Sequence, residues 1–242
     1  MNLTETHKQI ASVLKSAGKD TPYTADANET DPRYLGYGVR APQMKQLIAQ
    51  WRGDFRQLDD QSRVALARRL INSGYGEQKS VALSLLNMSI DYFDAEQFDL
   101  VDQLIRKLHG WSKIDAYSGS FLKSLLSQHP DEMLALSRAW STDSELWLRR
   151  ASVVLFTRSV ARSGKHIDHA LELCELLKHD NEDLVQKGVG WCLKDHLRFD
   201  KPRIKDYIVK LRQQSVPSTV TLYAMRDLAK AERQAIISRG KL

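Results

Sequence analysis

Apolar residues recur at intervals of three and four positions along almost the whole chain after residue 40. Segments such as "DDQSRVALARRLINSG", "DAEQFDLVDQLIRKLHG" and "TDSELWLRRASVVLFTRSVARSG" follow this spacing, and alternating strand-like patterns are absent. The spacing predicts amphipathic α-helices. We expect Pro42 in the first turn of a helix and Asp94, Asp143 and Asn181 as N-caps. Gly74 and Gly164 are expected to follow the ends of helices. We therefore expect about a dozen helices joined by short turns.

The predicted helices repeat along the chain. "ELWLRRASVVLF" from Glu145 and "DLVQKGVGWCLK" from Asp183 superpose with a shift of 38 residues, and "GEQKSVALSLL" from Gly76 is a looser third copy. A period near 40 residues is typical of HEAT-like or armadillo-like helix pairs, which stack because each buries its apolar face only against its neighbours. The predicted fold is therefore an all-α, HEAT-like or ARM-like α-solenoid with a concave basic groove, forming a single domain over residues 1–242. An irregular helical bundle is the alternative.

Composition limits the kind of protein further. The chain has 242 residues, of which 42% are hydrophobic, enough for one large core or two small ones. No apolar run approaches the length of about 18 residues that a membrane span needs, and the polar N-terminal segment does not resemble a signal peptide. We expect a cytoplasmic protein that does not associate with membranes, and nothing in the sequence demands an assembly larger than a monomer.

Neither a metal nor another cofactor is expected. The two cysteines, Cys174 and Cys192, lie in predicted helices without a C-x-x-C partner. The seven histidines are dispersed, and the close pair His166 and His169 has no third ligand nearby. A disulfide framework and a zinc site are therefore both disfavoured.

The positive charge is concentrated near the C-terminus. The chain carries 36 Lys and Arg against 30 Asp and Glu, a net charge of +6. Residues 198–242 alone hold eleven basic and four acidic residues, so the preceding residues carry a net charge of −1. This distribution suits a polyanionic partner, although a solvated surface would also explain it.

The stretch "GWSKIDAYSGSFLKSLL", residues 110–126, places a carboxylate on an apolar helix face. At about 100° per residue, Trp111 and Asp115 lie about 40° apart on the side that also carries Phe121 and Leu125. A polar residue there is costly unless it finds a partner. Asp115 is therefore the strongest candidate for a functional residue.

Two further helices carry residues that a pure core helix would not choose. In "LWLRRAS", Trp147 precedes Arg149 and Arg150, and an arginine on a concave surface suits a phosphate. Only one of these arginines can point directly at a given target, and either could instead cover apolar surface with its stem.

In "QKGVGWCLK", Gly188 and Gly190 lie three positions and one position before Trp191. Each glycine in a helix interior costs about 1 kcal/mol relative to alanine. The glycines either let a neighbouring helix approach closely or leave room beside Trp191 for a ligand.

The motifs "YLGYGVRAPQMKQL", "GWSKIDAYSGSFL", "LWLRRASVVLF" and "VQKGVGWCLKD" together resemble the DNA alkylation repair glycosylases built from HEAT-like repeats, the AlkC/AlkD group. The resemblance covers most of the chain. It implies that Asp115 is the catalytic carboxylate, with Trp111 and Trp191 as aromatic walls. It also implies DNA binding by Arg150, to which we add Arg149 and Lys187 as DNA-binding candidates. A tyrosine that family members often add from the first repeat has only Tyr34 and Tyr37 as possible counterparts.

The activity implied by this resemblance is monofunctional hydrolysis of the N-glycosidic bond of cationic alkylated purines, of the 3-methyladenine or 7-methylguanine type, in double-stranded DNA. A cationic base is already a good leaving group, so stabilisation of positive charge by indole faces and a carboxylate suffices. Two alternatives stay open. One is a non-catalytic member of the scaffold that binds damaged or branched DNA, in which Lys113 pairs with Asp115. The other is a HEAT-like protein–protein scaffold.

Overall fold

The computed structural model describes residues 2–18 and 31–240 and contains helices throughout. Within these ranges there is no β-strand, and Leu35 and Tyr75 form one isolated parallel bridge. The prediction of an all-α protein is therefore confirmed. No helix in the described ranges is long and apolar enough to cross a membrane.

The predicted helix boundaries are largely confirmed. Pro42 lies in the first turn of its helix, and Gly74 and Gly164 adopt positive φ angles of 85° and 67° after their helices. A positive φ suits glycine because it lacks a Cβ. Of the expected N-caps, Asp94 is confirmed, because its side chain accepts the backbone N–H of Glu96 at 2.9 Å. Asp143 and Asn181 are wrong, because the N-cap residues of those two helices are Glu145 and Glu182.

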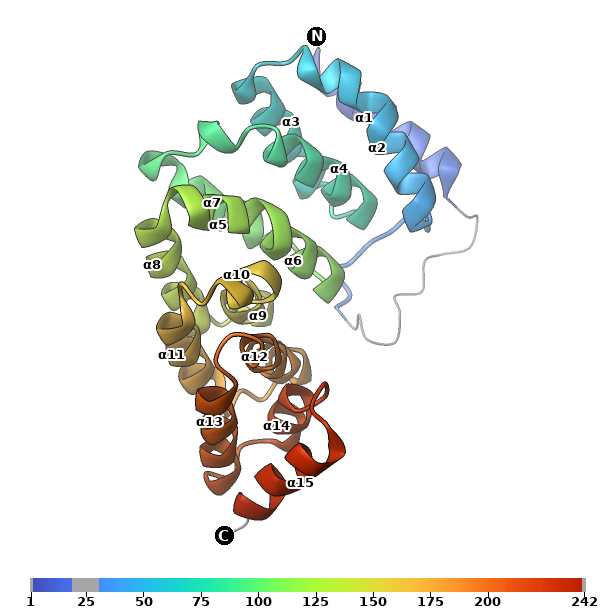
Figure 1. The fold of residues 1–242 in the computed structure, drawn as a ribbon. Coiled ribbons are helices and arrows are strands. Elements are labelled where there is room, and N and C mark those ends of the chain that lie inside the picture. The colour runs from blue at the N-terminus through green and yellow to red at the C-terminus, as the bar shows by residue number, and fades with distance from the viewer. Residues whose placement is uncertain (1, 19–30, 241–242) are drawn as a thin grey trace. The chain divides into compact units, whose positions relative to one another are not determined.

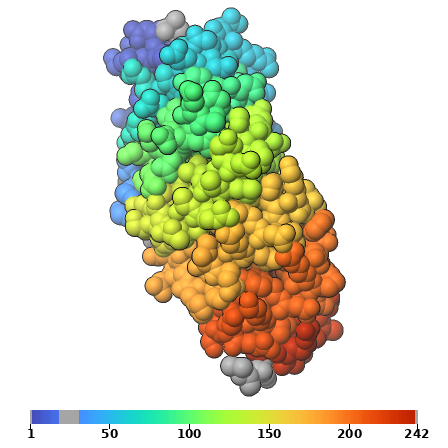
Figure 2. All heavy atoms as spheres, turned by 90° about the vertical axis from the view of Figure 1, so that its left-hand side faces the viewer, coloured from blue at the N-terminus to red at the C-terminus, as the bar shows by residue number. Residues whose placement is uncertain are grey.

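The chain divides into two compact units, residues 1–129 and 130–242, and each is described by itself. The solenoid that the repeats predict, continuous over residues 1–242, stays a prediction. Within each unit, segments close in sequence follow one another across the visible surface (Figure 2).

In the first unit the helices are α1 (Leu3–Ala17), α2 (Ala41–Arg56), α3 (Asp60–Asn72), α4 (Gly76–Asn87), α5 (Phe98–Ile105), α6 (Trp111–Tyr117) and α7 (Lys123–Gln128) (Figure 1). From α2 onward, the helices of the first unit are joined by short connections, including 3-10 turns at Ile90–Tyr92 and Ala95–Gln97. Helix α4 packs against α3 and also contacts α1, α2 and α6. Its Val81 and Leu85 are fully buried, as are Leu66 and Leu70 of α3. The first core is therefore centred on the α3–α4 pair.

In the second unit the helices are α8 (Pro130–Ser141), α9 (Leu146–Val154), α10 (Arg158–Ser163), α11 (Ile167–Leu177), α12 (Asp183–His196), α13 (Lys201–Gln213), α14 (Ser218–Ala224) and α15 (Lys230–Arg239). Helix α12 is central, because it packs against α9, α10, α11, α13 and α14. Its Val189 and Leu193 are fully buried. Cys174 and Cys192 are buried free thiols.

The glycines of α12 allow its neighbours to approach closely. A Cβ on Gly190 would lie 2.7 Å from the Val220 carbonyl oxygen and 2.7 Å from the Tyr223 Cβ, both on α14. A Cβ on Gly188 would lie 3.2 Å from the Val153 Cγ2 of α9. Both glycines thus face neighbouring helices, which favours close helix packing over room for a ligand.

We expect Gly190→Ala to lower the free energy of unfolding by about 1–3 kcal/mol, because the added methyl group overpacks against the α14 backbone. Gly53→Ala in α2 is the matched control, since a Cβ there meets nothing within 4 Å. The control should raise stability by about 0.5–1 kcal/mol through helix propensity alone. Chemical denaturation of both variants measures the difference, and equal stabilisation of the two would contradict the close α12–α14 contact.

Candidate functional site

Helix α6 begins at Trp111 because Gly110 turns the chain there. Gly110 has a φ of 88°, a conformation in which a side chain would be strained, and serves as the N-cap. Trp111 is half-buried, and its Nε1 is buried without a hydrogen-bond partner among the described residues. The indole edge is therefore inserted into the protein while part of the ring stays accessible.

Asp115 follows one turn later and is buried, with 7% of its surface exposed. Its neighbours Ile114 and Tyr117 are 1% and 0% exposed. Phe121, Leu122 and Leu125 are fully buried further along the same segment. The expectation that a carboxylate lies in an apolar face is therefore confirmed.

Two hydrogen bonds attach α6 to α4. The Tyr117 hydroxyl, fully buried, donates to the Lys79 carbonyl oxygen at 2.6 Å. Lys113 Nζ donates to Ser80 Oγ at 2.8 Å, from the position two residues before Asp115. Burial raises the pKa of Tyr117 well above its usual value, so this hydroxyl stays a donor. These bonds fix the turn of α6 that carries Trp111 and Asp115.

The helix expected over residues 110–126 contains a wider turn that the sequence did not predict. Residues Ser118–Leu122 form a π-helix between α6 and α7. Ser120 Oγ donates a hydrogen bond to the Ala116 carbonyl oxygen at 2.8 Å in this turn. Such single π turns occur often at functional sites.

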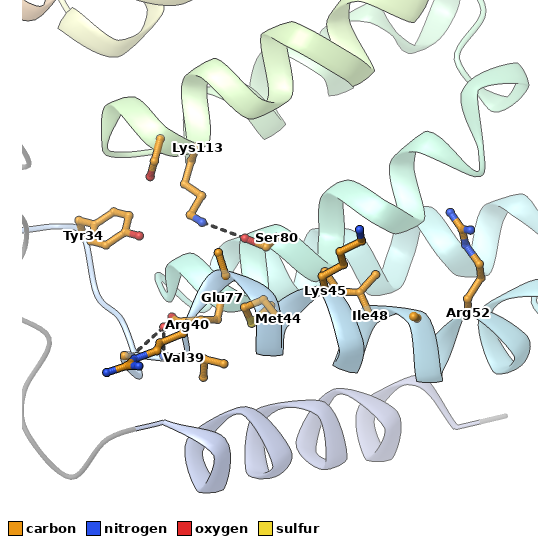
Figure 3. Close-up of a pocket in the computed structure, with 14 residues that line it drawn as sticks. Tyr34, Val39, Arg40, Met44, Lys45, Ile48, Arg52, Glu77, Ser80 and Lys113 are labelled. Carbon is orange, nitrogen blue, oxygen red and sulfur yellow. Dashed lines mark hydrogen bonds between the residues drawn. The ribbon is translucent and has the colours of Figure 1, made fainter.

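A cavity of about 730 Å³ lies in the first unit beside the start of α6 (Figure 3). Ser112 and Lys113 of α6 line it together with Tyr34. The other candidate tyrosine has a packing role: Tyr37 stacks on Tyr75 with ring centroids 4.1 Å apart, and its hydroxyl accepts from Gln78 Nε2 at 2.8 Å. Of the two, Tyr34 is the one that lines the cavity beside Ser112 and Lys113.

Lys79 of α4 is a buried amine close to this site. It is 0% exposed, and its Nζ has no hydrogen-bond partner among the described residues. The pKa of Lys79 is lowered to about 8, first by burial and then by the charge of Lys113. Asp31 acts in the opposite direction and Arg33 adds to the lowering. A protonated Lys79 is therefore a cost to the folded state at neutral pH.

We expect Lys79→Met to raise the free energy of unfolding at pH 7 by about 1–3 kcal/mol, because it removes a desolvated charge. In the wild type, the unfolded chain binds a proton between pH 8 and the ordinary lysine value of 10.5 that the folded state has released. Wild-type stability should therefore rise with pH across that window, and the advantage of the variant should shrink. Urea denaturation from pH 7 to 10.5 measures this. Lys8→Met, at an exposed lysine of α1, is the control and should show no such convergence.

In the second unit, the two arginines of α9 have different surroundings. Arg150 is 5% exposed and its Nη1 donates to the Leu184 carbonyl oxygen. Arg149 forms an ion pair with Asp180, with 2.6 Å between Nε and Oδ2, and donates to two further backbone carbonyls. Trp147 is buried in the core at 2% exposed. These contacts of Arg149 are all with residues of the second unit. DNA binding by Arg149 stays a prediction.

Trp191 of α12 is half-buried, and a cation covers its ring. The Arg158 guanidinium carbon lies 4.7 Å from the indole centroid. Arg158 has a positive φ of 56°, and its backbone N–H donates to Asp195 Oδ2 at 2.7 Å. Lys187 pairs with Asp183 one turn earlier, at 2.6 Å. Trp191 therefore already binds a positive charge through its ring face in the free protein.

Sequence reasoning missed Arg158 and the basic residues of the cavity. No spacing rule links Arg158 to Trp191, because they lie on different helices and meet only through the packing of α10 on α12. Lys45 and Arg52 lie on one face of α2, and Lys113 of α6 lines the same cavity. The sequence shows the spacing of Lys45 and Arg52 but not that Lys113 lies near them. Within residues 2–18 and 31–240, no three His, Cys, Asp or Glu side chains form a group that could hold a metal ion.

Comparison with known proteins identifies the class. The family model described as DNA alkylation repair enzyme matches residues 6–228. A solved structure described as a predicted DNA alkylation repair enzyme from Enterococcus faecalis shares the fold, with a TM-score of 0.70 and 16% identity over 93% of this chain and 96% of that one. No curated protein matches the sequence. The fold is thus that of an all-helical DNA repair protein. The chain belongs to the DNA alkylation repair enzyme family and is AlkD-like, as the sequence motifs implied.

Proposed function

We propose that this protein is a DNA glycosylase that releases cationic alkylated purines from double-stranded DNA. The observation that supports this best is a carboxylate, Asp115, held 93% buried one turn after the half-buried Trp111 in a chain of this family. Burial strengthens the attraction between such a carboxylate and a positive charge that arrives with the substrate.

The proposed reaction is hydrolysis at the sugar carbon that bears the base. The bond between C1′ and the purine nitrogen breaks, and its electron pair neutralises the cationic base, which therefore needs no acid to leave. Positive charge develops on the sugar, where the Asp115 carboxylate stabilises it. Water then forms the new C1′–O bond and gives up a proton, for which the same carboxylate is the nearest proposed acceptor.

In this proposal, which follows the family resemblance, an indole face of Trp111 or of Trp191 attracts a cationic base with about 0.5–2 kcal/mol. The Arg158 guanidinium occupies the Trp191 face in the free protein. A cationic base and this guanidinium repel each other, so Arg158 must leave the ring when the base arrives. An adjacent DNA phosphate is the natural acceptor for it.

We expect Asp115→Asn to slow base release at least about 100-fold, because the amide removes the negative charge that the transition state needs. The measurement is chromatography of free 3-methyladenine and 7-methylguanine from methylated duplex DNA, with DNA binding measured in parallel. Binding should change little.

Asp99→Asn, at an exposed carboxylate in the first turn of α5, is the matched control and should release base at the wild-type rate. Wild-type release in Asp115→Asn would reject Asp115 as the catalytic carboxylate. If the wild type itself yields no base above the spontaneous rate, the protein is a non-catalytic DNA-binding member of the family.

A double-mutant cycle tests whether Trp111 and Trp191 act on one base. Each tryptophan changed to alanine should slow release by about 2- to 30-fold, corresponding to the loss of one cation–π contact. If both indoles contact the same base, the losses in the double variant should not add, because the two contacts depend on one position of that base. Strict additivity would mean that the two tryptophans act independently.

A further inference from the structure

The cavity beside α6 is lined by apolar residues and by cations that have no part in the proposed hydrolysis. It is bounded by α2 on one side and by the starts of α4 and α6 on the other, and we call it the α2 cavity. Its volume of about 730 Å³ is within the range of small-molecule sites. All of the residues that line it belong to the first unit.

One face of α2 supplies six of the fourteen lining residues. The lining residues of this helix recur at three- and four-residue intervals and so share one face: Ala41, Met44, Lys45, Ile48, Ala49 and Arg52. Met44 is buried and Ile48 half-buried, while Lys45 and Arg52 are exposed. The wall therefore combines an apolar floor with a row of cations.

Cations from α2 and α6 border the same space. Lys45 and Arg52 project from α2 toward the side on which Lys113 lies (Figure 3). Along the helix axis Lys45 and Arg52 are separated by about 10 Å, which is longer than one phosphate group. Lys113 lines the same cavity from α6 and donates to Ser80. The arrangement suits several phosphates in a row.

Glu77 is the one carboxylate among the residues that line the cavity, and it does not offset the positive charge that a ligand would meet. Glu77 is 7% exposed, and its Oε1 accepts the backbone N–H groups of Tyr37, Gly38 and Val39 at 3.0, 2.9 and 3.2 Å. Three oriented N–H dipoles offset its negative charge locally. The exposed charges of the cavity are therefore positive.

We propose that the α2 cavity binds a short single-stranded segment of DNA, with phosphates on Lys45, Arg52 and Lys113 and one unstacked base on the apolar floor. In a duplex, base faces are covered by stacking, so phosphate contacts would use the cations and leave the accessible apolar surface of the half-buried Ile48 uncontacted. A single strand offers both phosphates and bare base faces, which is the combination that single-strand binding sites use. Tyr34 lies at the edge of the cavity and offers an aromatic face to a neighbouring base. This activity goes beyond the proposed hydrolysis, which needs only duplex DNA.

The test uses the full-length protein and a fluorescein-labelled oligodeoxythymidylate of about ten nucleotides, titrated by anisotropy at several salt concentrations. The Lys45→Ala/Arg52→Ala double variant should bind at least tenfold more weakly. Its slope of log affinity against log salt should decrease in magnitude by about 1.4, because each lost phosphate contact on a single strand is worth about 0.7. Lys8→Ala/Arg56→Ala removes two exposed charges of the same unit outside the cavity and should leave the oligonucleotide affinity nearly unchanged.

A neutral change separates base contact from charge. Ile48→Ser should weaken oligonucleotide binding several-fold without changing the salt slope, because it alters the floor and no phosphate contact. A thermal melt shows whether Ile48→Ser is folded. The Lys45→Ala/Arg52→Ala variant, changed at exposed positions, tests the proposal even if Ile48→Ser does not fold.

Three outcomes overturn the proposal. One is unchanged oligonucleotide affinity in the Lys45→Ala/Arg52→Ala variant, and another is equal loss in the Lys8→Ala/Arg56→Ala control. The third is an equal loss of affinity for the oligonucleotide and for a blunt duplex, which would mean ordinary duplex phosphate contacts. Base release in Asp115→Asn is a separate readout, so failure of the glycosylase proposal and failure of this one are distinguishable.

Discussion

The candidate site depends on the attachment of α6 to α4. The buried Tyr117 hydroxyl donates to the Lys79 carbonyl oxygen, and Lys113 donates to Ser80, so α4 holds α6 from positions on either side of Asp115. A hydrogen bond in a low-dielectric interior is stronger and more costly to break than one in water. This attachment keeps a carboxylate buried and an indole partly exposed within one helical turn.

A destabilising group lies beside this attachment. Lys79 supplies the carbonyl that anchors Tyr117, yet its own amine is buried without a hydrogen-bond partner among the described residues. Asp115 adds a buried carboxylate on the facing helix. Proteins retain an unfavourable buried amine mostly where function needs it, because an apolar residue in the same place would be more stable. The concentration of buried charge at α4 and α6 thus supports the same region that the tryptophan and aspartate motif indicates.

The second unit uses its unusual residues differently. Gly188 and Gly190, which were open to two interpretations in the sequence, face α9 and α14 and allow close packing. Trp191 of the same helix stays half-buried, and Arg158 covers its ring. A ring that already binds a guanidinium is suited to a cationic base, and the exchange of one cation for another would link base binding to the movement of Arg158. The pairing of Arg149 with Asp180 shows, in contrast, that adjacent arginines in a motif can have separate roles.

The sequence by itself determined the all-helical class, most helix ends and the burial of Asp115, because helical periodicity and the special backbone needs of glycine and proline are local properties. Its ordered motifs also identified the family. The tertiary structure decided the π turn after Tyr117, the anchoring of α6, the cation over Trp191 and the basic cavity along α2. Each of these depends on contacts between residues far apart in the chain or on a local departure from ideal helix geometry. No spacing within one helix can specify which residues of another helix it will meet.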